Sequence, residues 1–353
     1  MIGIDILEGP PSPPPSPPSS GGLDPHPWWV VLGSAYKSPN ATALVEHRAD
    51  GTTKTVSVRA LQEAVKLVAA VCVHQYGLQP KEVIGMHLER GEAYAVLLLT
   101  CSYLGCYALP MPTDYPDDRL AIVATTAGAK LVCVAMPLPK VGAGLRASAT
   151  CVEASALMRS GSVAPPLPPH VEDAQLGGII LASSGSTGTP KLIQRTQASF
   201  FHRLRWTWTT LPYAPGEACV QKSVSTTTHS LYELLEPLLG GLGCHVLPEV
   251  GQMGGAVAFC DKLAQLQVSR LLVVPTSANA RLERTPRLCH TCQPTRPPTR
   301  PPTRPPTRPS ARPSARPSTG GLTRGLAATV RAGCSTPSSP PSSPCRARCR
   351  SSS

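Results

Sequence analysis

The segment from Leu181 to Thr196, LASSGSTGTPKLIQRT, holds the side chains best suited to chemistry. Seven of the eight residues from Ser183 to Pro190 are Ser, Thr or Gly, and Lys191 follows them directly. Glycines allow backbone N–H groups to converge on one anion, and hydroxyl and ammonium groups add further donors. This composition predicts a phosphate-binding loop made of Ser184, Gly185, Ser186, Thr187, Gly188, Thr189 and Lys191.

The spacing inside this segment differs from the two commonest phosphate-binding patterns. A P-loop requires G-x-x-x-x-G-K-[ST], whereas Pro190 lies five residues after Gly185 and Leu192 follows the lysine. The dinucleotide pattern G-x-G-x-x-G is absent as well. A polar linker without a ligand is the alternative interpretation. The apolar run before the segment and the Lys-Leu-Ile sequence after it favour a turn between two strands, with Pro190 fixing the turn.

The elements that must position this loop follow from the periodicity of apolar residues. Strand and helix patterns alternate through the middle of the chain, which predicts an α/β fold with layered, largely parallel sheets. The expected strands are 82–88, 106–111, 130–135, 177–183, 191–195 and 270–275. The expected helices begin after Ser57 and cover 92–105, 116–127, 199–211, 230–239 and 255–267.

The net charge of the chain is +12, but the excess is confined to one end. Residues 285–353 contain 12 Arg and no Lys, Asp or Glu, which leaves 21 basic and 21 acidic residues before them. A nucleic-acid-binding surface needs a basic patch on the folded part of a protein. We therefore expect no nucleic-acid partner.

Composition divides the chain into three parts. Residues 1–22 are rich in Pro and Ser, residues 23–284 have ordinary globular composition, and residues 285–353 are rich in Pro, Arg and Ser. The two ends contain too few apolar residues to form a core, so we expect disordered Pro-rich ends. From Thr295 the tail repeats with a period of four, and a mis-assigned exon or a shifted frame is an alternative origin for it. The repeats are also similar to polyproline ligands of SH3-like domains.

Cysteine usage and hydropathy bear on the location of the protein. Eight of the 13 Cys precede Thr285, several inside apolar runs, which is typical of buried free thiols in a reducing compartment. No apolar run is long enough to cross a membrane, and the N-terminus lacks a secretory signal pattern. We therefore expect a cytoplasmic protein without a membrane partner, with an organelle as the alternative. Cys289 and Cys292 have C-x-x-C spacing but no second pair nearby, so we expect no metal site there.

Three stretches, in the right order, resemble the adenylate-forming (AMP-binding) superfamily of acyl-CoA synthetases, aryl-acid ligases and nonribosomal-peptide-synthetase adenylation domains. The sequence ILASSGSTGTPKLIQRT resembles the signature loop of that family. Upstream, GCYALPMPTDYPDDRL resembles its G-A-Y-x-P-x-D-x-x-Y-P-x-x-R-L segment. Downstream, RLRWTWTTLPYAPGEACVQKSVSTTTHSLYELLEPLLGG resembles the stretch that follows the loop in peptide-synthetase-type domains. The resemblance covers the chain from about Leu23 to Ala280.

This resemblance implies the fold of the N-terminal part of an adenylate-forming enzyme and a reaction in two steps. A carboxylic acid attacks the α-phosphate of ATP in the presence of Mg²⁺, which gives an acyl-adenylate and pyrophosphate. A thiol then displaces AMP, and this thiol belongs either to coenzyme A or to the phosphopantetheine of a carrier protein. By resemblance, the loop Ser184 to Thr189 and Lys191 would hold the β- and γ-phosphates, where charge develops on the leaving group.

The departures from the family pattern concern the substrate. Amino-acid-activating members carry an Asp two residues before the Ser of an S-x-x-E segment, and this Asp holds the substrate ammonium. Ser230 and Glu233 fit that segment, but Thr228 stands in the place of the Asp and His229 follows it. Thr228 and His229 are therefore the candidate substrate-pocket residues, and an ordinary α-amino acid is not the expected substrate. Gln197 stands where many members have His.

The later motifs of the family have no match after Pro275. These are the segment for adenine and Mg²⁺, the ribose-binding Asp, the hinge and the late lysine that meets the substrate carboxylate. We therefore expect a truncated enzyme with little or no ligase activity, and we assign no catalytic residue. The alternative function is a non-catalytic scaffold or interaction protein with Pro-rich disordered tails.

Overall fold

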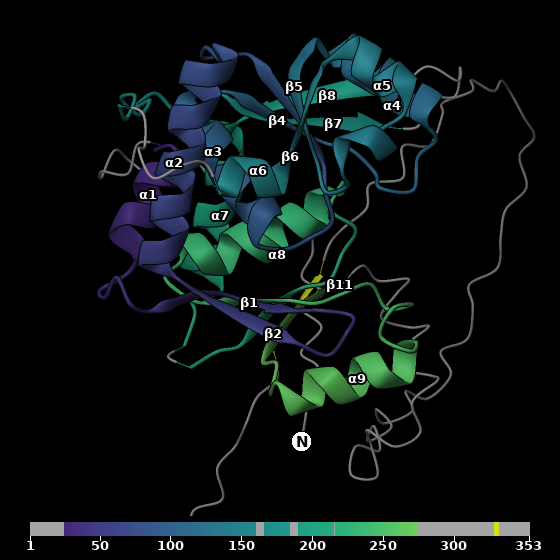
Figure 1. The fold of residues 1–353 in the computed structure, drawn as a ribbon. Helices are drawn as coiled ribbons and strands as arrows, with labels where there is room; N and C mark the ends of the chain where they lie inside the picture. Colours follow the sequence, from purple (N-terminus) through teal and green to yellow (C-terminus); the bar gives the residue numbers. More distant parts are fainter. Residues whose placement is uncertain (1–24, 160–165, 184–189, 215, 274–327, 332–353) are drawn as a thin grey trace, which may run out of the picture.

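Two six-stranded sheets form the framework of the molecule, and helices pack between them and on their outer faces (Figure 1). The computed structural model describes residues 25–159, 166–183, 190–214, 216–273 and 328–331. Most neighbouring strands are parallel, as the alternation of strands and helices in the sequence predicts. The fold is therefore of the layered α/β class.

The upper sheet in Figure 1 has the strand order β6-β5-β3-β4-β7-β8. Its strands are β3 (Val83–His87), β4 (Tyr107–Pro110), β5 (Ala129–Val134), β6 (Thr150–Glu153), β7 (Gly178–Ser183) and β8 (Lys191–Thr196). All neighbours are parallel except β7 and β8, which form an antiparallel hairpin. Strands β3 and β4 are buried along their whole length, which is typical of central parallel strands covered on both faces.

The lower sheet has the strand order β12-β11-β9-β10-β1-β2. Its strands are β1 (Thr42–His47), β2 (Thr53–Ser57), β9 (Cys219–Gln221), β10 (Cys244–Val246), β11 (Arg270–Val273) and β12 (Ala328–Arg331). The inner pairs are parallel, and β2 and β12 are antiparallel edge strands. Leu44 on β1 pairs with Cys244 on β10, so this sheet joins segments that are far apart in the chain.

The helices fill three layers around the sheets. They are α1 (Trp28–Ala35), α2 (Val58–Tyr76), α3 (Glu92–Leu104), α4 (Asp117–Ala127), α5 (Ala143–Ser148), α6 (Ala154–Met158), α7 (Gln197–Thr210), α8 (Thr228–Leu239) and α9 (Ala256–Gln265), with a 3-10 turn at Leu138–Lys140. Figure 1 shows α8 running between the two sheets, α4 and α5 above the upper sheet, and α9 below the lower one. Every residue of α3 from Tyr94 to Leu104 is buried, because this helix lies inside the central layer.

Local sequence signals explain where the long helices begin and end. The Ser57 hydroxyl accepts a hydrogen bond from the backbone N–H of Ala60, which caps the start of α2. Gly77 ends the same helix in the left-handed region, at φ +60°, and its N–H bonds to carbonyl groups of the last turn. The Ser cap and the 3–4 spacing of apolar residues predict this helix, and the structure confirms it.

The strands and helices expected between Ser57 and Pro275 are all present, with ends shifted by a few residues. The elements that the sequence did not predict are α1, α5, α6, β1, β2, β6, β9 and β10. Within the predicted tail, the structure describes only Ala328–Arg331, which forms β12 where no regular structure was expected. The rest of both predicted tails lies outside the described residues, as does the Cys289–Cys292 pair.

The eight cysteines in the described part of the chain carry free thiols, and six of them are buried, as the sequence predicts. Burial raises the pKa of the Cys72 thiol to about 12. These thiols are therefore protonated at neutral pH and are poor nucleophiles. Among the described residues, no helix has both the length and the apolar character needed to cross a membrane.

The close approach of β7 to the chain before β4 gives a first prediction. Gly177 has φ +70°, and a Cβ atom there would lie 2.4 Å from the carbonyl oxygen of Cys106, whereas Gly51, at φ +83°, has open space around it. Alanine at either position costs about 1–2 kcal/mol for the left-handed backbone. Only Gly177→Ala adds a clash with backbone atoms, so it should lower the free energy of unfolding by at least about 1 kcal/mol more than Gly51→Ala in urea. Equal losses would contradict this packing.

Candidate functional site

The Ser/Gly loop joins the two strands of the β7–β8 hairpin. The register pairs Ser183 with Lys191, so the loop leaves directly after the apolar strand and returns at the lysine, as the sequence predicts. Lys191 is exposed at the start of β8. Residues 184–189 lie outside the described residues, and their role as phosphate donors stays a prediction. Both ends of the loop therefore lie together at one edge of the upper sheet.

The parallel strands next to the hairpin end at the same edge. Ala108 on β4 pairs with Ile179 on β7, and Met86 on β3 pairs with Pro110 on β4. The carboxyl ends of β3, β4 and β7 are therefore side by side. In open α/β sheets, ligands bind beyond the carboxyl ends of the strands. The loop and the segments that follow β3 and β4 thus share the edge at which a ligand is expected.

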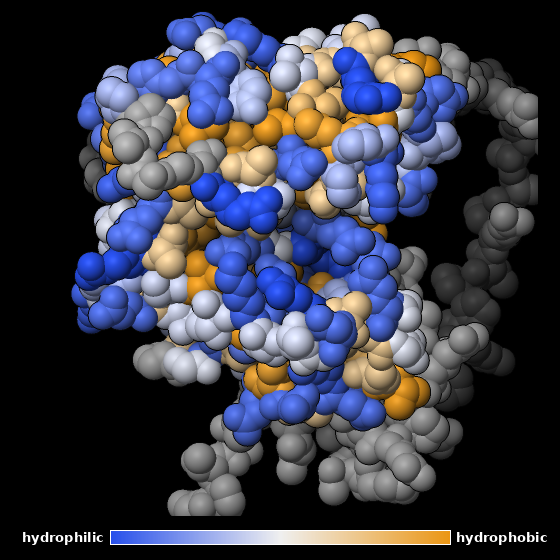
Figure 2. All heavy atoms as spheres, viewed as in Figure 1, coloured by the Kyte–Doolittle hydropathy of each residue, from blue (hydrophilic) through white to orange (hydrophobic). Residues whose placement is uncertain are grey.

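A cavity of about 190 Å³ lies at this edge, between the two sheets. Its lining comes from the segments that directly follow β3, β4, β9 and β10: Glu89, Arg90, Pro112, Thr113, Asp114, Val224, Ser225, Leu247, Pro248 and Glu249. In Figure 2 the molecule is hollowed between its upper and lower parts, and polar residues gather there. Sites for small molecules usually enclose roughly 300–1,000 Å³. The cavity lined by these described residues is smaller than that range.

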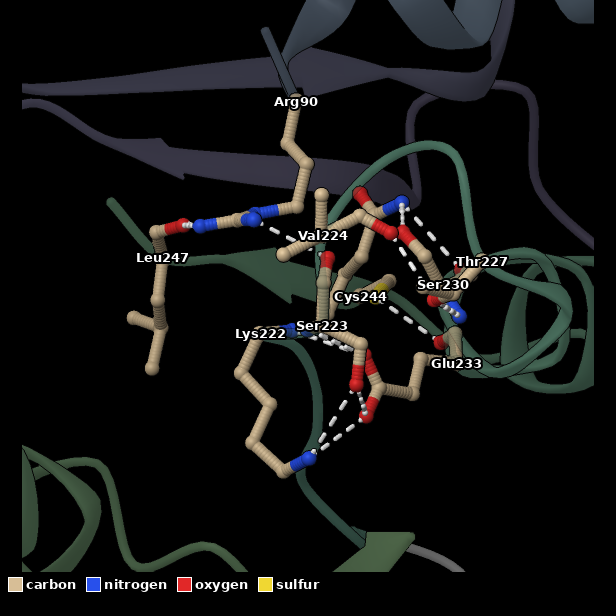
Figure 3. A network of polar contacts seen from close by, with 10 residues as sticks. Arg90, Lys222, Ser223, Val224, Thr227, Ser230, Glu233, Cys244 and Leu247 are labelled. Carbon is tan, nitrogen blue, oxygen red and sulfur yellow. Dashed lines mark hydrogen bonds and ion pairs between the residues drawn. The ribbon is translucent and has the colours of Figure 1, made fainter. Parts of the chain in front are cut away.

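Arg90 fixes the loops of the lower sheet against the end of β3. Its Nη1 donates to the carbonyl oxygen of Ser223 at 2.9 Å, and its Nε and Nη2 donate to that of Leu247 at 3.2 and 3.1 Å (Figure 3). Burial lowers the pKa of the guanidinium, and the nearby charge of Glu249 acts in the opposite direction. An arginine directly after a buried strand was a signal for this residue, but sequence reasoning did not identify it. Its donors hold backbone groups, so Arg90 shapes the cavity.

The carboxylate of Glu233 on α8 holds the chain that leaves β9. Its Oε2 accepts hydrogen bonds from the backbone N–H groups of Lys222 and Ser223, at 2.9 and 2.8 Å. Its Oε1 accepts from the Lys222 ammonium and the Ser223 hydroxyl, both at 2.8 Å (Figure 3). The side chain of Glu233 is only 1% exposed. Both oxygens of a buried charge are thus satisfied, as burial of a carboxylate requires.

The candidate substrate residues lie in the first turn of α8. This helix begins at Thr228, two residues earlier than expected, because the Thr227 hydroxyl accepts a hydrogen bond from the N–H of Ser230. Thr228 and His229 are half-buried, and they follow the segment of Ser225, which lines the cavity. Neither Thr228 nor His229 lines the cavity itself. The structure therefore places them near the cavity, and their contact with a substrate stays a prediction.

Gln197, which the sequence analysis marks as a departure from the family pattern, is fully buried at the end of the hairpin. Its Oε1 accepts from the N–H of Trp28, at 3.0 Å, and from the Ser102 hydroxyl. Its Nε2 donates to the carbonyl oxygen of Leu176 at 2.8 Å. The side chain thus ties α1, α3 and the start of β7 to the hairpin. The sequence marks this position only as a departure from the family and gives no signal for these contacts.

A second tie connects the hairpin to α8. Nη1 of Arg195 on β8 donates to the Tyr232 hydroxyl at 3.3 Å, and its guanidinium carbon lies 4.4 Å from the centroid of the Phe200 ring. Phe200 and Tyr232 also contact each other, with ring centroids 5.3 Å apart. The strand that carries Lys191 is therefore held against the helix that carries Thr228 and His229.

The side chains of the described residues decide whether the site can hold a metal ion. No three side chains of His, Cys, Asp or Glu come together there as a metal site. Mg²⁺ commonly keeps several waters and is bound by one or two carboxylates together with phosphate oxygens of the substrate. Asp114 and Glu89 line the cavity and are carboxylates of this kind. The residues present therefore fit a Mg²⁺ ion that arrives with a nucleotide.

Comparison with known proteins agrees with this geometry. A family model described as AMP-binding enzyme matches residues 33–321, which is most of the chain and extends beyond the expected boundary at residue 284. The beta-alanyl-bioamine nonribosomal peptide synthetase ebony of Drosophila melanogaster is 28% identical over 253 residues, which are 67% of this chain and 28% of the synthetase. The chain thus spans little more than a quarter of that relative.

Solved structures show the same fold. The N-terminal subdomain of NpsA from Klebsiella oxytoca superposes with a TM-score of 0.60 at 19% identity, over 70% of this chain and 61% of that one. The fatty acyl-adenylate ligase of L. pneumophila, in complex with acyl adenylate and pyrophosphate, also gives a TM-score of 0.60, at 17% identity. There the match covers 69% of this chain and 43% of the ligase. The fold is that of the N-terminal subdomain of adenylate-forming enzymes.

The buried ion pair of Glu233 gives the prediction for this site. Glu233→Gln leaves the Lys222 ammonium buried without a counter-charge, which should cost about 3 kcal/mol of unfolding free energy or more. Glu82→Gln is the matched control, because Glu82 pairs with Lys130 at a partly exposed position and its loss should cost at most about 1 kcal/mol. Urea denaturation measures both. The account is wrong if the two substitutions cost the same.

Proposed function

The chain belongs to the family of AMP-binding enzymes, and from this premise we propose that it activates a carboxylic acid with ATP as an acyl-adenylate. The observation that carries this proposal is the β7–β8 hairpin. Its register places the ends of the Ser/Gly loop and Lys191 at the edge where the loops of both sheets converge on the cavity. Family membership and this placement favour an enzyme over the scaffold alternative.

The proposed chemistry is nucleophilic substitution at phosphorus. A carboxylate oxygen of the acid forms a bond to the α-phosphorus of ATP, and the bond from that phosphorus to the bridging oxygen of the β-phosphate breaks. Pyrophosphate leaves with the electron pair, so negative charge develops on the β- and γ-phosphates. Residues 184–189, through their N–H and hydroxyl groups, and Lys191 stabilise that charge. Mg²⁺, when bound, would be held by Asp114 and Glu89 and would neutralise part of the same charge.

For the second step we propose transfer of the acyl group to a thiol. The thiol releases its proton to solvent, the thiolate sulfur forms a bond to the acyl carbon, and AMP leaves with the electrons of the broken carbon–oxygen bond. The similarity to a nonribosomal peptide synthetase supports the phosphopantetheine of a carrier protein as the acceptor, with coenzyme A as the alternative. No described residue is assigned a part in this step.

The substrate proposal depends on Thr228. This residue offers a hydroxyl group at the position where amino-acid-activating relatives carry a carboxylate, so it supplies no counter-charge for an α-ammonium group. We therefore propose an acid without an α-ammonium group, such as an aryl or acyl acid. The cavity lined by the described residues is smaller than the sites that small molecules usually occupy. We accordingly propose weak turnover for this 353-residue chain.

The phosphate role of Lys191 is tested by ATP binding. Lys191→Met removes a charged donor from the phosphates and should weaken the affinity for Mg-ATP by roughly tenfold, about the effect of one charge-assisted hydrogen bond. Isothermal titration calorimetry measures the affinity. Lys140→Met is the control, because Lys140 is exposed in a 3-10 turn of the upper part. Equal affinities of the two variants would remove Lys191 from the site.

The substrate class is tested by exchange of radioactive pyrophosphate into ATP with a panel of acids. We expect slow exchange, highest with aryl or acyl acids and at background with α-amino acids. Thr228→Asp should lower the exchange with simple acids, because it adds a negative charge beside the substrate carboxylate. Exchange that is highest with an α-amino acid would overturn the substrate proposal. Fast exchange with any acid would overturn the proposal of weak turnover.

A further inference from the structure

A second pocket lies on the outer side of the lower sheet, away from the cavity described above. Its volume is about 190 Å³, and it is lined by His47, Arg48, Ala49, Gly51, Pro248, Gln252, Met253, Ala258 and Lys262. These residues come from the end of β1, the turn after it, the segment after β10 and helix α9. Figure 1 shows α9 below the sheet that contains β1 and β2. The pocket shares only Pro248 with the first cavity.

Two histidines on neighbouring strands contact each other beside this pocket, and one of them, His47, lines it. The β1–β10 register pairs Val45 with His245, so His47, two residues further along β1, points to the same face of the sheet. Nε2 of His47 lies 3.1 Å from Nδ1 of His245, which is one hydrogen bond with a single shared proton. His47 is only 9% exposed, and its Nδ1 has no hydrogen-bond partner among the described residues. A buried polar atom of this kind is normally satisfied, so this nitrogen is available to bind a ligand.

The side chains around the two imidazoles are cationic. Lys262 of α9 and Arg48 at the end of β1 both line the pocket. Burial, followed by the charges of Lys262 and His245, lowers the pKa of His47 to about 4. Burial and Lys262 also lower the pKa of His245. The pocket is therefore lined by the cationic side chains of Arg48 and Lys262 and by the imidazole of His47, which is in contact with His245.

Carboxylates of the neighbouring elements are engaged elsewhere or exposed. Glu46, on the opposite face of β1, accepts hydrogen bonds from the N–H of Glu92 and from Nε of Arg48. Glu92 in turn pairs with Lys54 of β2. Asp50, in the turn after β1, accepts from Thr52, and Asp261 on α9 is exposed to solvent.

Glu249, in the segment after β10, lines the first cavity instead. None of these carboxylates is a cause of the lowered pKa values of the two imidazoles. Arg48 is therefore paired with Glu46, and Lys262 is the cation of the pocket that forms no ion pair with a carboxylate among the described residues.

We propose that this pocket binds a tetrahedral oxyanion, a phosphate group, and that binding takes up a proton at the His47–His245 pair. The ammonium of Lys262, the guanidinium of Arg48 and the Nδ1 of His47 are the donors. In the free chain Nδ1 of His47 has no partner, and a bound dianion gives it an acceptor and stabilises the imidazolium form. This site is independent of the Ser/Gly loop, and its existence does not rest on the proposed function.

A metal ion fits these residues less well. Two imidazoles without a thiolate or carboxylate are an incomplete ligand set, and no group of three metal-ligating side chains is found among the described residues. The ammonium of Lys262 also disfavours a second cation beside the pair. Zinc binding at His47 and His245 is therefore a result that would contradict the proposal.

The test uses the full chain with isotopically labelled histidine, observed by NMR, so that the readout is local to the pocket. His47→Gln and His245→Gln assign the two signals. Sulfate, whose charge is constant between pH 5 and pH 8, inorganic phosphate and glycerol phosphate are titrated at constant ionic strength, with acetate as the comparison. We expect saturable shifts of both signals with the tetrahedral anions and not with acetate. The affinity for sulfate should rise as the pH falls from 7 to 5, because the complex holds a proton that the free chain does not.

Matched variants decide the outcome. Lys262→Met should weaken the affinity for sulfate by roughly tenfold or more, whereas Lys66→Met, at an exposed position of α2, should leave it unchanged. Lys191→Met, in the Ser/Gly loop, should also leave the histidine shifts unchanged, which separates the two sites. If both glycerol phosphate and inorganic phosphate bind, the ligand of the pocket is a phosphorylated molecule. If only the inorganic anions bind, the ligand is free phosphate. The proposal is overturned if the histidine shifts are absent or do not saturate. It is also overturned if Lys262→Met weakens the affinity for sulfate no more than the two control substitutions do, or if zinc binds stoichiometrically.

Discussion

Burial of the Glu233 carboxylate is the constraint on which the rest of the cleft depends. A charge removed from water costs several kcal/mol unless every oxygen finds a donor. Here four donors come from two consecutive residues, Lys222 and Ser223, so the chain leaving β9 has one conformation that satisfies the charge. That conformation carries Val224 and Ser225 into the wall of the cavity. One buried charge on α8 thereby sets the shape of a loop in the lower sheet.

Arg90 extends the same principle to the upper sheet. Its guanidinium comes from the segment after β3 and binds the carbonyl groups of Ser223 and Leu247, which follow β9 and β10. Glu233 thus fixes the loop after β9, and Arg90 joins that loop to the upper sheet through backbone carbonyl groups. Because parallel strands end at a common edge, these loops meet where the Ser/Gly hairpin ends. The position of the cleft is set by the direction of the parallel strands, and its shape is set by these two charged side chains.

Sequence reasoning predicted the elements that have strong local signals. Helix α2 has a Ser cap and a 3–4 apolar period, and the β7–β8 hairpin has apolar strands on both sides of the Ser/Gly loop, so both were found. Strands β9 and β10 have three residues each, too few for a period of two, and they join β1 across most of the chain. The pairing of His47 with His245 arises only from those distant contacts. The partners of Glu233 are 10 and 11 residues before it, and they depend on the packing of α8 against β9. The residue types were visible in the sequence, but their neighbours were not.

The central claim is that the Ser/Gly loop holds the phosphates of ATP through its backbone N–H groups. Hydrogen–deuterium exchange of the intact chain, followed by mass spectrometry of the peptides around residues 178–196, tests it directly. With saturating Mg-ATP, amide exchange of residues 184–189 should slow several-fold, because bound amides exchange only after the nucleotide leaves. Peptides that cover helix α2, Val58–Tyr76, should be unaffected. Unchanged exchange in the loop, at nucleotide concentrations that slow exchange elsewhere, would contradict the account.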